Sequence, residues 1–279
     1  MDHRRTENFY IIVSPGLEET CAAELSAIGI PPRQIDKGGI ACTGRLRELY
    51  LANLWLRTAS RVLVRFAACR SRDFPDLYRK ARQLPWGRFI HAETPVAFRV
   101  ACHGSRLNHS TRVAETLESA LNRALGRSTN PTGKDPQLVM VRIVEDVVTI
   151  SIDTSGELLH RRGYRKTVTA APLRETLAAG ILMLLDWQGH EALVDPMCGS
   201  GTFVIEAAER AEEAEIRAAW KKDPENKGDG STQTAGGNEA AVQKIRLVSR
   251  RVAQRRESTD FEIPFFDDED HGQHERSYF

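Results

Sequence analysis

The stretch from residue 192 to residue 202 has the sequence ALVDPMCGSGT and decides how the rest of the chain is interpreted. Its first four residues, 192–195, are apolar except for the last and predict a short buried strand. Gly199 and Gly201 follow in a tight turn, and residues 203–211 then predict a helix. A strand that passes through a glycine turn into a helix is the repeating unit of parallel α/β sheets.

The glycine turn is suited to a ligand that carries a carboxylate. Glycine has no Cβ, so the backbone can approach a ligand closely, and the free N–H groups at the start of a helix favour an anion. S-adenosylmethionine (SAM) has such a carboxylate on its methionine part. The pattern is not a P-loop, and Val204 stands where a dinucleotide motif would have its third glycine. An ordinary turn between a strand and a helix stays open as the alternative.

The first 66 residues predict a small α+β unit with the order β-α-β-α-β. Residue 29 is a glycine, which is typical of a helix C-terminus, and Leu17, Cys21, Leu25 and Ile28 before it recur at helical spacing. The expected strands are 9–13, 38–42 and 62–66, and the expected helices are 17–28 and 46–56.

A second unit of similar size follows it. Helices are expected at 74–84 and 110–125, and strands at 96–100, 138–144 and 147–153. The last two strands are separated only by Glu145-Asp146, which indicates a hairpin. Pro172 then opens a further predicted helix, because proline is favoured in the first turn. The expected buried stripe of this helix consists of Leu173, Leu177, Ile181, Leu184 and Leu185.

The positive charge is concentrated in the middle of the chain. Residues 45–180 contain 23 Lys and Arg against 12 Asp and Glu, a net charge of +11, whereas the whole chain has +1. Twenty of the 23 cations are arginine, whose planar guanidinium binds phosphate and stacks on bases. The distribution favours a polyanionic partner. An arginine-rich surface without a nucleic-acid partner is the alternative.

Composition argues against several other classes of protein. No apolar run approaches the roughly 20 residues that span a bilayer, so no membrane partner is expected. The five cysteines are scattered and form no C-x-x-C pair, which indicates no zinc site and no disulfide framework. The N-terminus has no signal-peptide pattern. A reducing cytoplasm is therefore the expected location.

Residues 194–202 resemble the SAM-binding first motif of THUMP-containing RNA methyltransferases. The similarity is greatest to the large-subunit rRNA guanine-N2 methyltransferases, and residues 162–165 and 171–179 resemble the segment before that motif. The resemblance covers about residues 8–211. It implies an α/β and α+β chain with a ferredoxin-like N-terminal region (1–60), a THUMP RNA-binding domain (45–155) and the start of a Rossmann-like methyltransferase domain (160–211). Residues 212–279 are interpreted as a linker and tail. Within them, residues 212–222 are expected to extend the preceding helix, 227–237 to form a flexible linker and 244–256 a basic stretch, and an acidic tail is expected to begin at 267–270.

The same resemblance implies SAM-dependent methylation of guanine N2 in ribosomal RNA. Asp195, Gly199 and Gly201 would then line the cofactor pocket, with Pro196 and Thr202 shaping the loop. The basic residues proposed to contact RNA are Arg99, Arg106, Arg112, Arg123, Arg127, Arg161, Arg162, Arg165 and Lys166. Tyr164 would stack on a base or pack within the connector.

The chain departs from the family at the target-binding motif. Family members carry an acidic residue at the end of the next strand and an Asn-Pro-Pro-aromatic motif, and Asn-Pro-Pro occurs nowhere in this sequence. No catalytic residue is therefore named. Two interpretations stay open: an RNA methyltransferase for which a partner chain supplies the rest of the domain, and an RNA-binding protein with a truncated, inactive methyltransferase domain.

Overall fold

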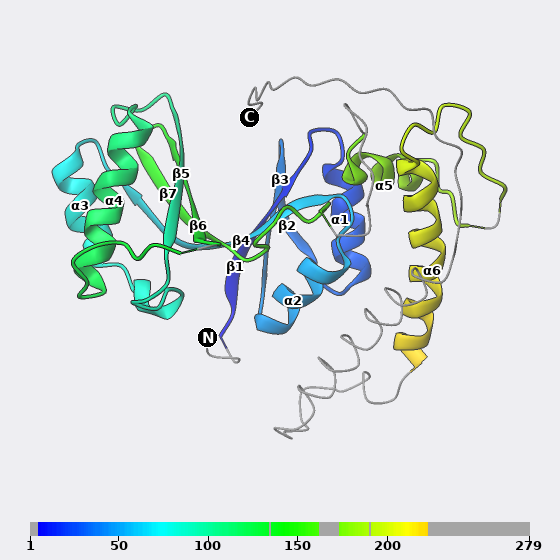
Figure 1. Ribbon diagram of the computed structural model, residues 1–279, viewed down its shortest axis with the longest axis horizontal. Coiled ribbons are helices and arrows are strands. Elements are labelled where there is room, and N and C mark those ends of the chain that lie inside the picture. Colours follow the sequence, from blue (N-terminus) through cyan, green and yellow to red (C-terminus); the bar gives the residue numbers. More distant parts are fainter. Residues whose placement is uncertain (1–4, 134, 162–172, 190, 223–279) are drawn as a thin grey trace. The chain divides into compact units, whose positions relative to one another are not determined.

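A single mixed sheet organises the residues described in the computed structural model, which are 5–133, 135–161, 173–189 and 191–222, with side chains described only up to residue 212. The strand order is β2-β3-β1-β4-β7-β6-β5, and all pairs are antiparallel except β5 with β6 (Figure 1). The strands are β1 (Glu7–Val13), β2 (Pro32–Asp36), β3 (Gly39–Gly44), β4 (Ala59–Arg70), β5 (Val96–His103), β6 (Gln137–Val144) and β7 (Val147–Asp153). The helices are α1 (Glu18–Ala27), α2 (Leu46–Trp55), α3 (Phe74–Arg82), α4 (Ser110–Ala124), α5 (Glu175–Leu184) and α6 (Thr202–Lys222), with a 3-10 turn η1 (Trp86–Arg88).

Strand β4 joins the two predicted units into one sheet. Its first half pairs with β1, where Val64 faces Phe9, and its second half pairs with β7, where Arg70 faces Val147. The sequence predicted two separate units with this strand ending at Phe66. The strand continues because an irregularity in register between Arg65 and Ala67 lets the chain stay paired with β7 beyond that point.

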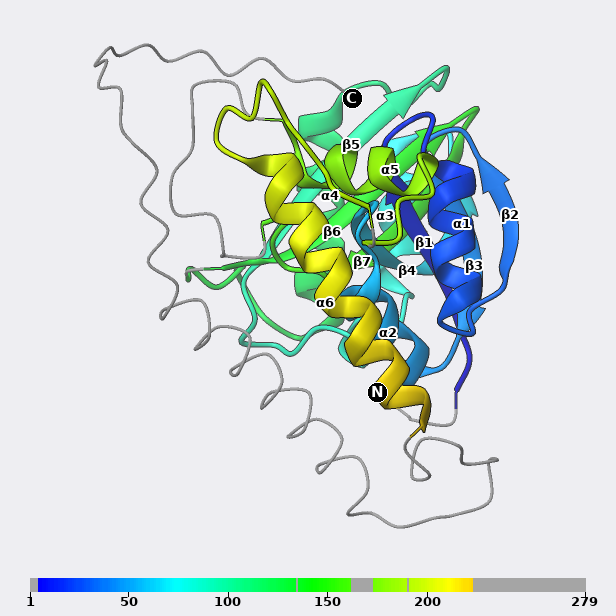
Figure 2. The same cartoon turned by 90° about the vertical axis from the view of Figure 1, so that its right-hand side faces the viewer.

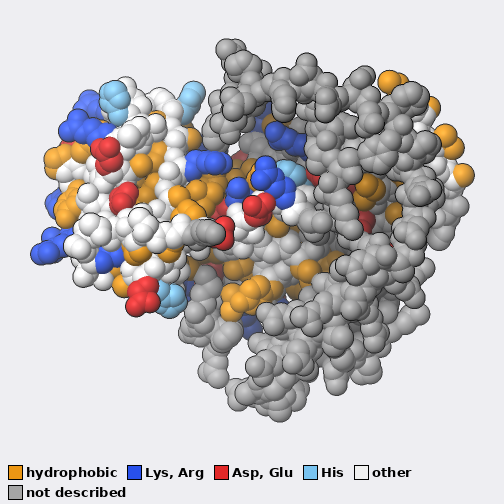
Figure 3. Space-filling view, in the orientation of Figure 1, with side chains coloured by type: hydrophobic (Ala, Val, Ile, Leu, Met, Phe, Trp, Pro, Cys, Tyr) orange, Lys and Arg blue, Asp and Glu red, His pale blue; other side chains and the backbone are white. Residues whose placement is uncertain are grey.

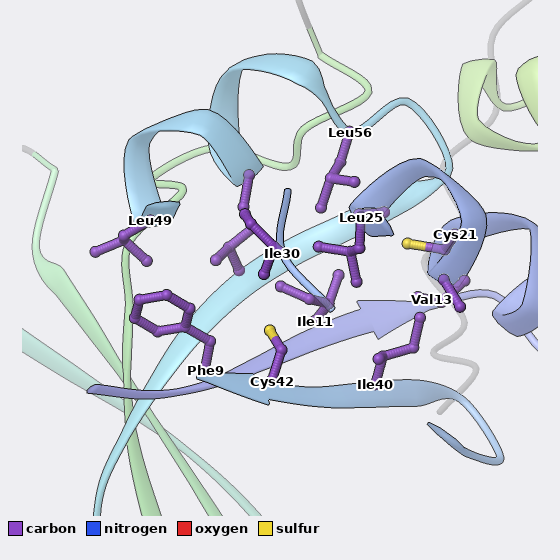
Figure 4. Packing of buried hydrophobic residues seen from close by; sticks show 14 of the residues in the cluster. Phe9, Ile11, Val13, Cys21, Leu25, Ile30, Ile40, Cys42, Leu49 and Leu56 are labelled. Atoms are coloured by element: carbon purple, nitrogen blue, oxygen red, sulfur yellow. The ribbon is translucent and has the colours of Figure 1, made fainter. Parts of the chain in front are cut away.

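The first core lies between α1, α2 and the β1–β3–β4 part of the sheet. Phe9, Ile11 and Val13 alternate along β1 and all point toward the helices (Figure 4). Leu17, Cys21 and Leu25 face them with 5% exposure or less, so the apolar face predicted for this helix is confirmed. Burial of each large side chain stabilises the fold by about 1.5–3 kcal/mol.

The second core lies under α3 and α4 and centres on Trp86. Its ring packs edge-on against Phe66 at 5.1 Å and Phe98 at 6.3 Å between centroids, and its indole N–H donates to the carbonyl of Ala81 over 2.7 Å. The predicted hairpin of β6 and β7 is confirmed. Its corner residues Glu145 and Asp146 have φ of 49° and 65°, as two-residue hairpin turns require.

Two features differ from the sequence expectation. Strand β2 was not predicted because its sequence, PRQID, is mostly polar; it lies at the sheet edge and pairs only with β3. In α5 the expected stripe is wrong for Ile181, Leu184 and Leu185, which are 38%, 64% and 70% exposed. The small residues Ala178, Ala179 and Gly180 are buried instead, because they let α5 approach α1 closely (Figure 2).

Several expectations fall outside the described residues. These are the helix start at Pro172, the flexible segment 227–237, the basic stretch 244–256 and the acidic tail at 267–270. The expected extension of the helix through residues 212–222 is confirmed by α6. Of the helices that the structure describes, none is long and apolar enough to cross a membrane.

Candidate functional site

The glycine loop, residues 195–201, connects to α6 through a hydrogen-bonded turn. The carboxylate of Asp195 accepts the N–H of Met197 over 3.1 Å. The N–H of Gly201 donates to the carbonyl of Cys198 over 2.7 Å, and the N–H of Ile205 donates to the carbonyl of Gly201 over 2.9 Å. The predicted turn is therefore present, and it places the glycines directly before the first turn of the helix.

Both glycines of the loop have a backbone that other residues rarely adopt. Gly199 has φ of 54° and Gly201 has φ of 76°, in the left-handed region that favours glycine. A Cβ on Gly199 would meet nothing within 4 Å. Glycine is therefore required here for its backbone conformation and not for lack of space, and the space beside Gly199 is open. The loop is accessible to solvent, and Met197 is 90% exposed. The turn thus has room for a ligand at the helix start.

Thr202 ties the end of the loop to the segment before α5. Its side chain is buried at 5% exposure, and its hydroxyl donates to the carbonyl of Leu173 over 3.4 Å. Pro196, by contrast, is exposed. Of the two residues expected to shape the loop, Thr202 makes a hydrogen bond that holds the end of the loop in place.

The strand predicted at residues 192–195 is not formed. This segment has no regular secondary structure, and Leu193 and Val194 are 37% and 82% exposed. A buried parallel strand needs neighbours on both sides, and every strand of the described residues belongs to the sheet of β1–β7. The apolar pattern is that of a strand whose pairing partners are not among the described residues.

The arginines proposed to contact RNA fall into separate groups. Arg99 is exposed on β5, Arg123 on α4, and Arg106 in the segment between β5 and α4. Arg112, also exposed, stacks its guanidinium 4.2 Å from the ring centre of Phe74. Arg161 is exposed and lies 3.7 Å from Glu157. The remaining proposed RNA contacts, Arg162, Tyr164, Arg165 and Lys166, lie outside the described residues.

Arg127 has a structural role that its sequence position did not reveal. Its guanidinium donates to the carbonyls of Ala92 and Thr94, each over 2.9 Å. It also donates to the side-chain oxygens of Asn122 over 2.7 Å and Asn130 over 3.1 Å. Burial lowers its pKa from the usual value. Most of its donors are therefore engaged in holding the loop around Asn130 to the end of α4.

One face of the sheet carries Arg65 and Arg142, which were not among the proposed RNA contacts, beside Arg99, which was. The helices α1 to α4 pack on the core face, whereas Arg65, Arg99 and Arg142 alternate with core residues on β4, β5 and β6 and so point to the opposite face. None of the helices in the described part of the chain packs on that face, and we call it the helix-free face. Arg65 stacks 3.6 Å from the ring centre of Tyr10. Strand alternation in residues 137–144 was the available signal, because Arg142 follows the buried Val141.

The helix-free face ends at a cluster of polar groups around the β6–β7 turn. The Asp146 carboxylate accepts the backbone N–H of Arg106 over 3.0 Å and pairs with Arg72 at 3.0 Å; the first of these contacts, with help from the second, lowers its pKa. A surface pocket of about 450 Å³ lies here, lined by Cys102, His103, Gly104, Ser105, Arg106, Asn108 and Asp146. Lys and Arg side chains also lie along the outer margin of the part that holds α3 and α4 (Figure 3).

Comparisons with known proteins divide the chain into three consecutive matches. Residues 8–63 match the RlmL ferredoxin-like domain, residues 71–153 the THUMP domain, and residues 162–260 the RMKL-like methyltransferase domain. The last match extends to residue 260, into the segment 212–279 that was interpreted as a linker and tail. The three matches follow one another along the chain in the order ferredoxin-like, THUMP and methyltransferase domain.

The similar proteins include curated rRNA methyltransferases and a solved methyltransferase structure. The "Ribosomal RNA large subunit methyltransferase K/L" of Marinomonas sp. (strain MWYL1) is 35% identical over 69% of this chain and 28% of its own length. The protein of the same name from Syntrophotalea carbinolica is 37% identical over 72% and 29%. Among solved structures, "SMU.472, a putative methyltransferase complexed with SAH" has a TM-score of 0.69 and 26% identity, over 87% of this chain and 65% of that chain.

The chain belongs to the THUMP-domain-containing RNA methyltransferase family, with the ferredoxin-like, THUMP and methyltransferase domains in that order. The fold class expected from the sequence is confirmed. The chain spans between a quarter and a third of the length of the two curated relatives it matches here.

Proposed function

We propose that the chain takes part in SAM-dependent methylation of RNA, with the RNA held by the arginine-bearing sheet and SAM by the glycine loop. The observation that carries the proposal is the pair of left-handed glycines, Gly199 and Gly201, directly before α6. Guanine N2 in large-subunit ribosomal RNA is the proposed target, supported by the names of the relatives. That target places the protein in the cytoplasm.

The loop has the features that SAM needs. Open space beside Gly199 allows a ligand to reach the backbone, and the start of α6 favours the methionine carboxylate. Asp195, Gly199 and Gly201 would hold the cofactor, with Pro196 and Thr202 shaping the loop around it. SAM supplies an electrophilic methyl group on its sulfonium. The SAH seen in the SMU.472 structure supports this choice of ligand.

The RNA would lie on the helix-free face of the sheet. Arg65, Arg99 and Arg142 face the same side from three strands, and guanidinium groups pair with phosphates and stack on bases. Arg106, between β5 and α4, and Arg112, on α4 itself, are also exposed and add positive charge to this domain. Methyl transfer to guanine N2 requires the base to be held out of its stack and aligned with the methyl donor. A partner chain would supply the Asn-Pro-Pro-aromatic motif that this sequence lacks.

A transfer assay tests the enzymatic part. The full chain is incubated with methyl-labelled SAM and protein-free large-subunit rRNA in the presence of a cell extract that supplies the partner chain, and label in RNA is counted and mapped to the modified base. The proposal expects label in guanine N2 above a control with Gly201→Val. Salt-sensitive RNA binding without any label would instead favour the second candidate, an RNA-binding protein with an inactive methyltransferase part.

A binding assay tests the RNA face by itself. The double variant R99S/R142S should bind an rRNA fragment roughly tenfold more weakly, and its salt dependence should fall by one to two units of slope, since each phosphate contact contributes roughly 0.7–0.9. Arg47→Ser is the matched control, because Arg47 lies on α2 on the other face of the sheet and is 64% exposed. Equal loss in both variants would show that only net charge matters.

A further inference from the structure

A buried polar network links the N-terminal domain to the helix that follows the glycine loop. Glu24 on α1 is only 7% exposed. Its carboxylate accepts the backbone N–H groups of Arg57 and Thr58, each over 3.0 Å, and the hydroxyl of Thr58. Glu24 therefore fixes the short connection between α2 and β4, and with it the point from which the Arg57 side chain leaves.

The Arg57 side chain reaches across to α6. One nitrogen lies 3.3 Å from Glu206 and the other 3.2 Å from Glu209. The three side chains are 8%, 3% and 16% exposed, so the pairs are shielded from water and weakly screened by salt. We call this set, Arg57 with Glu206 and Glu209, the Arg57 clasp.

The clasp holds the part of α6 that matters for the glycine loop. Glu206 lies one turn after Thr202, where the helix begins, and Glu209 lies on the next turn. The loop itself is largely exposed, so α6 is a main route by which its position relative to the sheet is set. Arg57 lies two residues before β4, which carries Arg65 of the helix-free face.

We propose that Arg57 is a positioning residue that sets the glycine loop at a fixed place relative to the RNA-binding sheet. This role rests on the proposed function, because positioning the loop matters only if the loop holds SAM. Arginine fits the task since its planar fork bridges carboxylates on two successive turns, and the single ammonium of lysine does not. Breaking one side of a buried pair leaves a charge without compensation.

Hydrogen exchange on the full chain tests the clasp directly. Arg57→Ala should raise the exchange of amides in residues 199–209 by about tenfold or more, while amides of β6 and β7 keep their wild-type rates. Arg57→Lys should fall between the two. Arg47→Ala is the matched control, because Arg47 pairs with Glu48 at 3.9 Å on the surface, and it should leave every rate unchanged. Unchanged protection of α6 in R57A would overturn the proposal.

Ligand binding separates positioning from general loss of structure. Titrated with SAH and with an rRNA fragment, R57A should bind SAH at least about tenfold more weakly and RNA as tightly as wild type, because the buried Arg57 does not reach the RNA face. Equal loss of both ligands would reduce Arg57 to a folding residue and overturn the positioning role. If R57A does not fold, Glu209→Gln removes one arm of the clasp and should show the same pattern at smaller size.

The clasp and the proposed function fail in different ways. A wild-type chain that binds no SAH contradicts the cofactor assignment, and the positioning role falls with it even if R57A loosens α6. A wild-type chain that binds SAH, together with an R57A variant that binds it equally well, contradicts the clasp alone.

Discussion

Leu17, the N-cap residue of α1, and Gly180 of α5 lie in direct contact across the junction between the first domain and the start of the methyltransferase part. A Cβ placed on Gly180 would come within 2.6 Å of both terminal methyl carbons of Leu17, which is 5% exposed. Helices approach this closely only where one of them offers a small residue. The contact explains why α5 buries its small side chains and exposes its larger ones.

Gly180→Val should therefore destabilise the chain by about 1–3 kcal/mol through overpacking, measured by urea unfolding. Adding Leu17→Ala should make the double variant more stable than the sum of the two single changes, because the valine fills the space that the leucine leaves. Ala208→Val, on the exposed side of α6, is the control and should change stability by less than about 0.5 kcal/mol. If the effects of Gly180→Val and Leu17→Ala on the unfolding free energy were additive, the direct contact between the two residues would be contradicted.

Arg127 and Arg99 should separate stability from RNA binding. Arg127→Ala removes hydrogen bonds to Ala92, Thr94, Asn122 and Asn130 and should cost about 2–4 kcal/mol of unfolding free energy, since bonds to charged groups contribute more than neutral ones. Arg99→Ala should leave stability within about 0.5 kcal/mol and weaken RNA binding. Thermal melts measure the stability of each variant, and fluorescence anisotropy on the same preparations measures its RNA binding. A fully stable R127A with weakened RNA binding would assign Arg127 to the interface instead.

Local patterns in the sequence were sufficient for most of the N-terminal fold. The alternation in residues 137–144, the turn at Glu145-Asp146 and the helical spacing of Leu17, Cys21 and Leu25 each depend on neighbours a few residues apart. Strand β2 escaped because an edge strand needs no apolar alternation. The joining of both units through β4 was also not predicted, because pairing between distant segments produces no local sequence pattern.

The candidate site was predictable where backbone chemistry dictates the residue type. Gly199 and Gly201 stand where the backbone turns left-handed, and their spacing could be recognised. The strand predicted at residues 192–195 does not form. Its apolar pattern is that of a strand buried between two neighbouring strands, and the described residues provide no such neighbours. Charge alone did not distinguish Arg127, whose donors are engaged, from Arg142, which faces solvent.

His160 should make stability depend on pH. It is half-buried, its Nδ1 finds no hydrogen-bond partner in the described part of the chain, and burial lowers its pKa below the usual 6.5. As the pH falls, the His160 imidazole is therefore protonated in the unfolded chain before it is protonated in the folded chain. Its contribution to stability is fully present above pH 6.5 and is lost as the pH drops toward the lowered pKa of the folded state.

His160→Gln should remove that part of the acid destabilisation. Urea unfolding of both proteins at pH 7.5 and 5.5 measures it, and the difference between them cancels the other titrating groups. Equal loss of stability in both proteins would show that His160 does not carry the effect.

The exposed leucines of α5 should promote self-association of the chain. Leu184 and Leu185 are 64% and 70% exposed beside the exposed Ile181, and contiguous apolar surface of this kind promotes association. The double variant L184Q/L185Q should bind less of a hydrophobic dye and sediment closer to the monomer, with unfolding free energy changed by less than about 0.5 kcal/mol. A large loss of stability would mean that both side chains are buried in solution.

The central claim, that the glycine loop holds SAM, is tested most directly by calorimetric titration of the full chain with SAH. The account predicts saturable binding at one site in the wild type. It also predicts loss of that binding in Gly201→Val, because φ of 76° at this position excludes a β-branched side chain. A wild type that gives no binding heat and no thermal shift with SAH, or a G201V variant that binds as tightly, would contradict the claim.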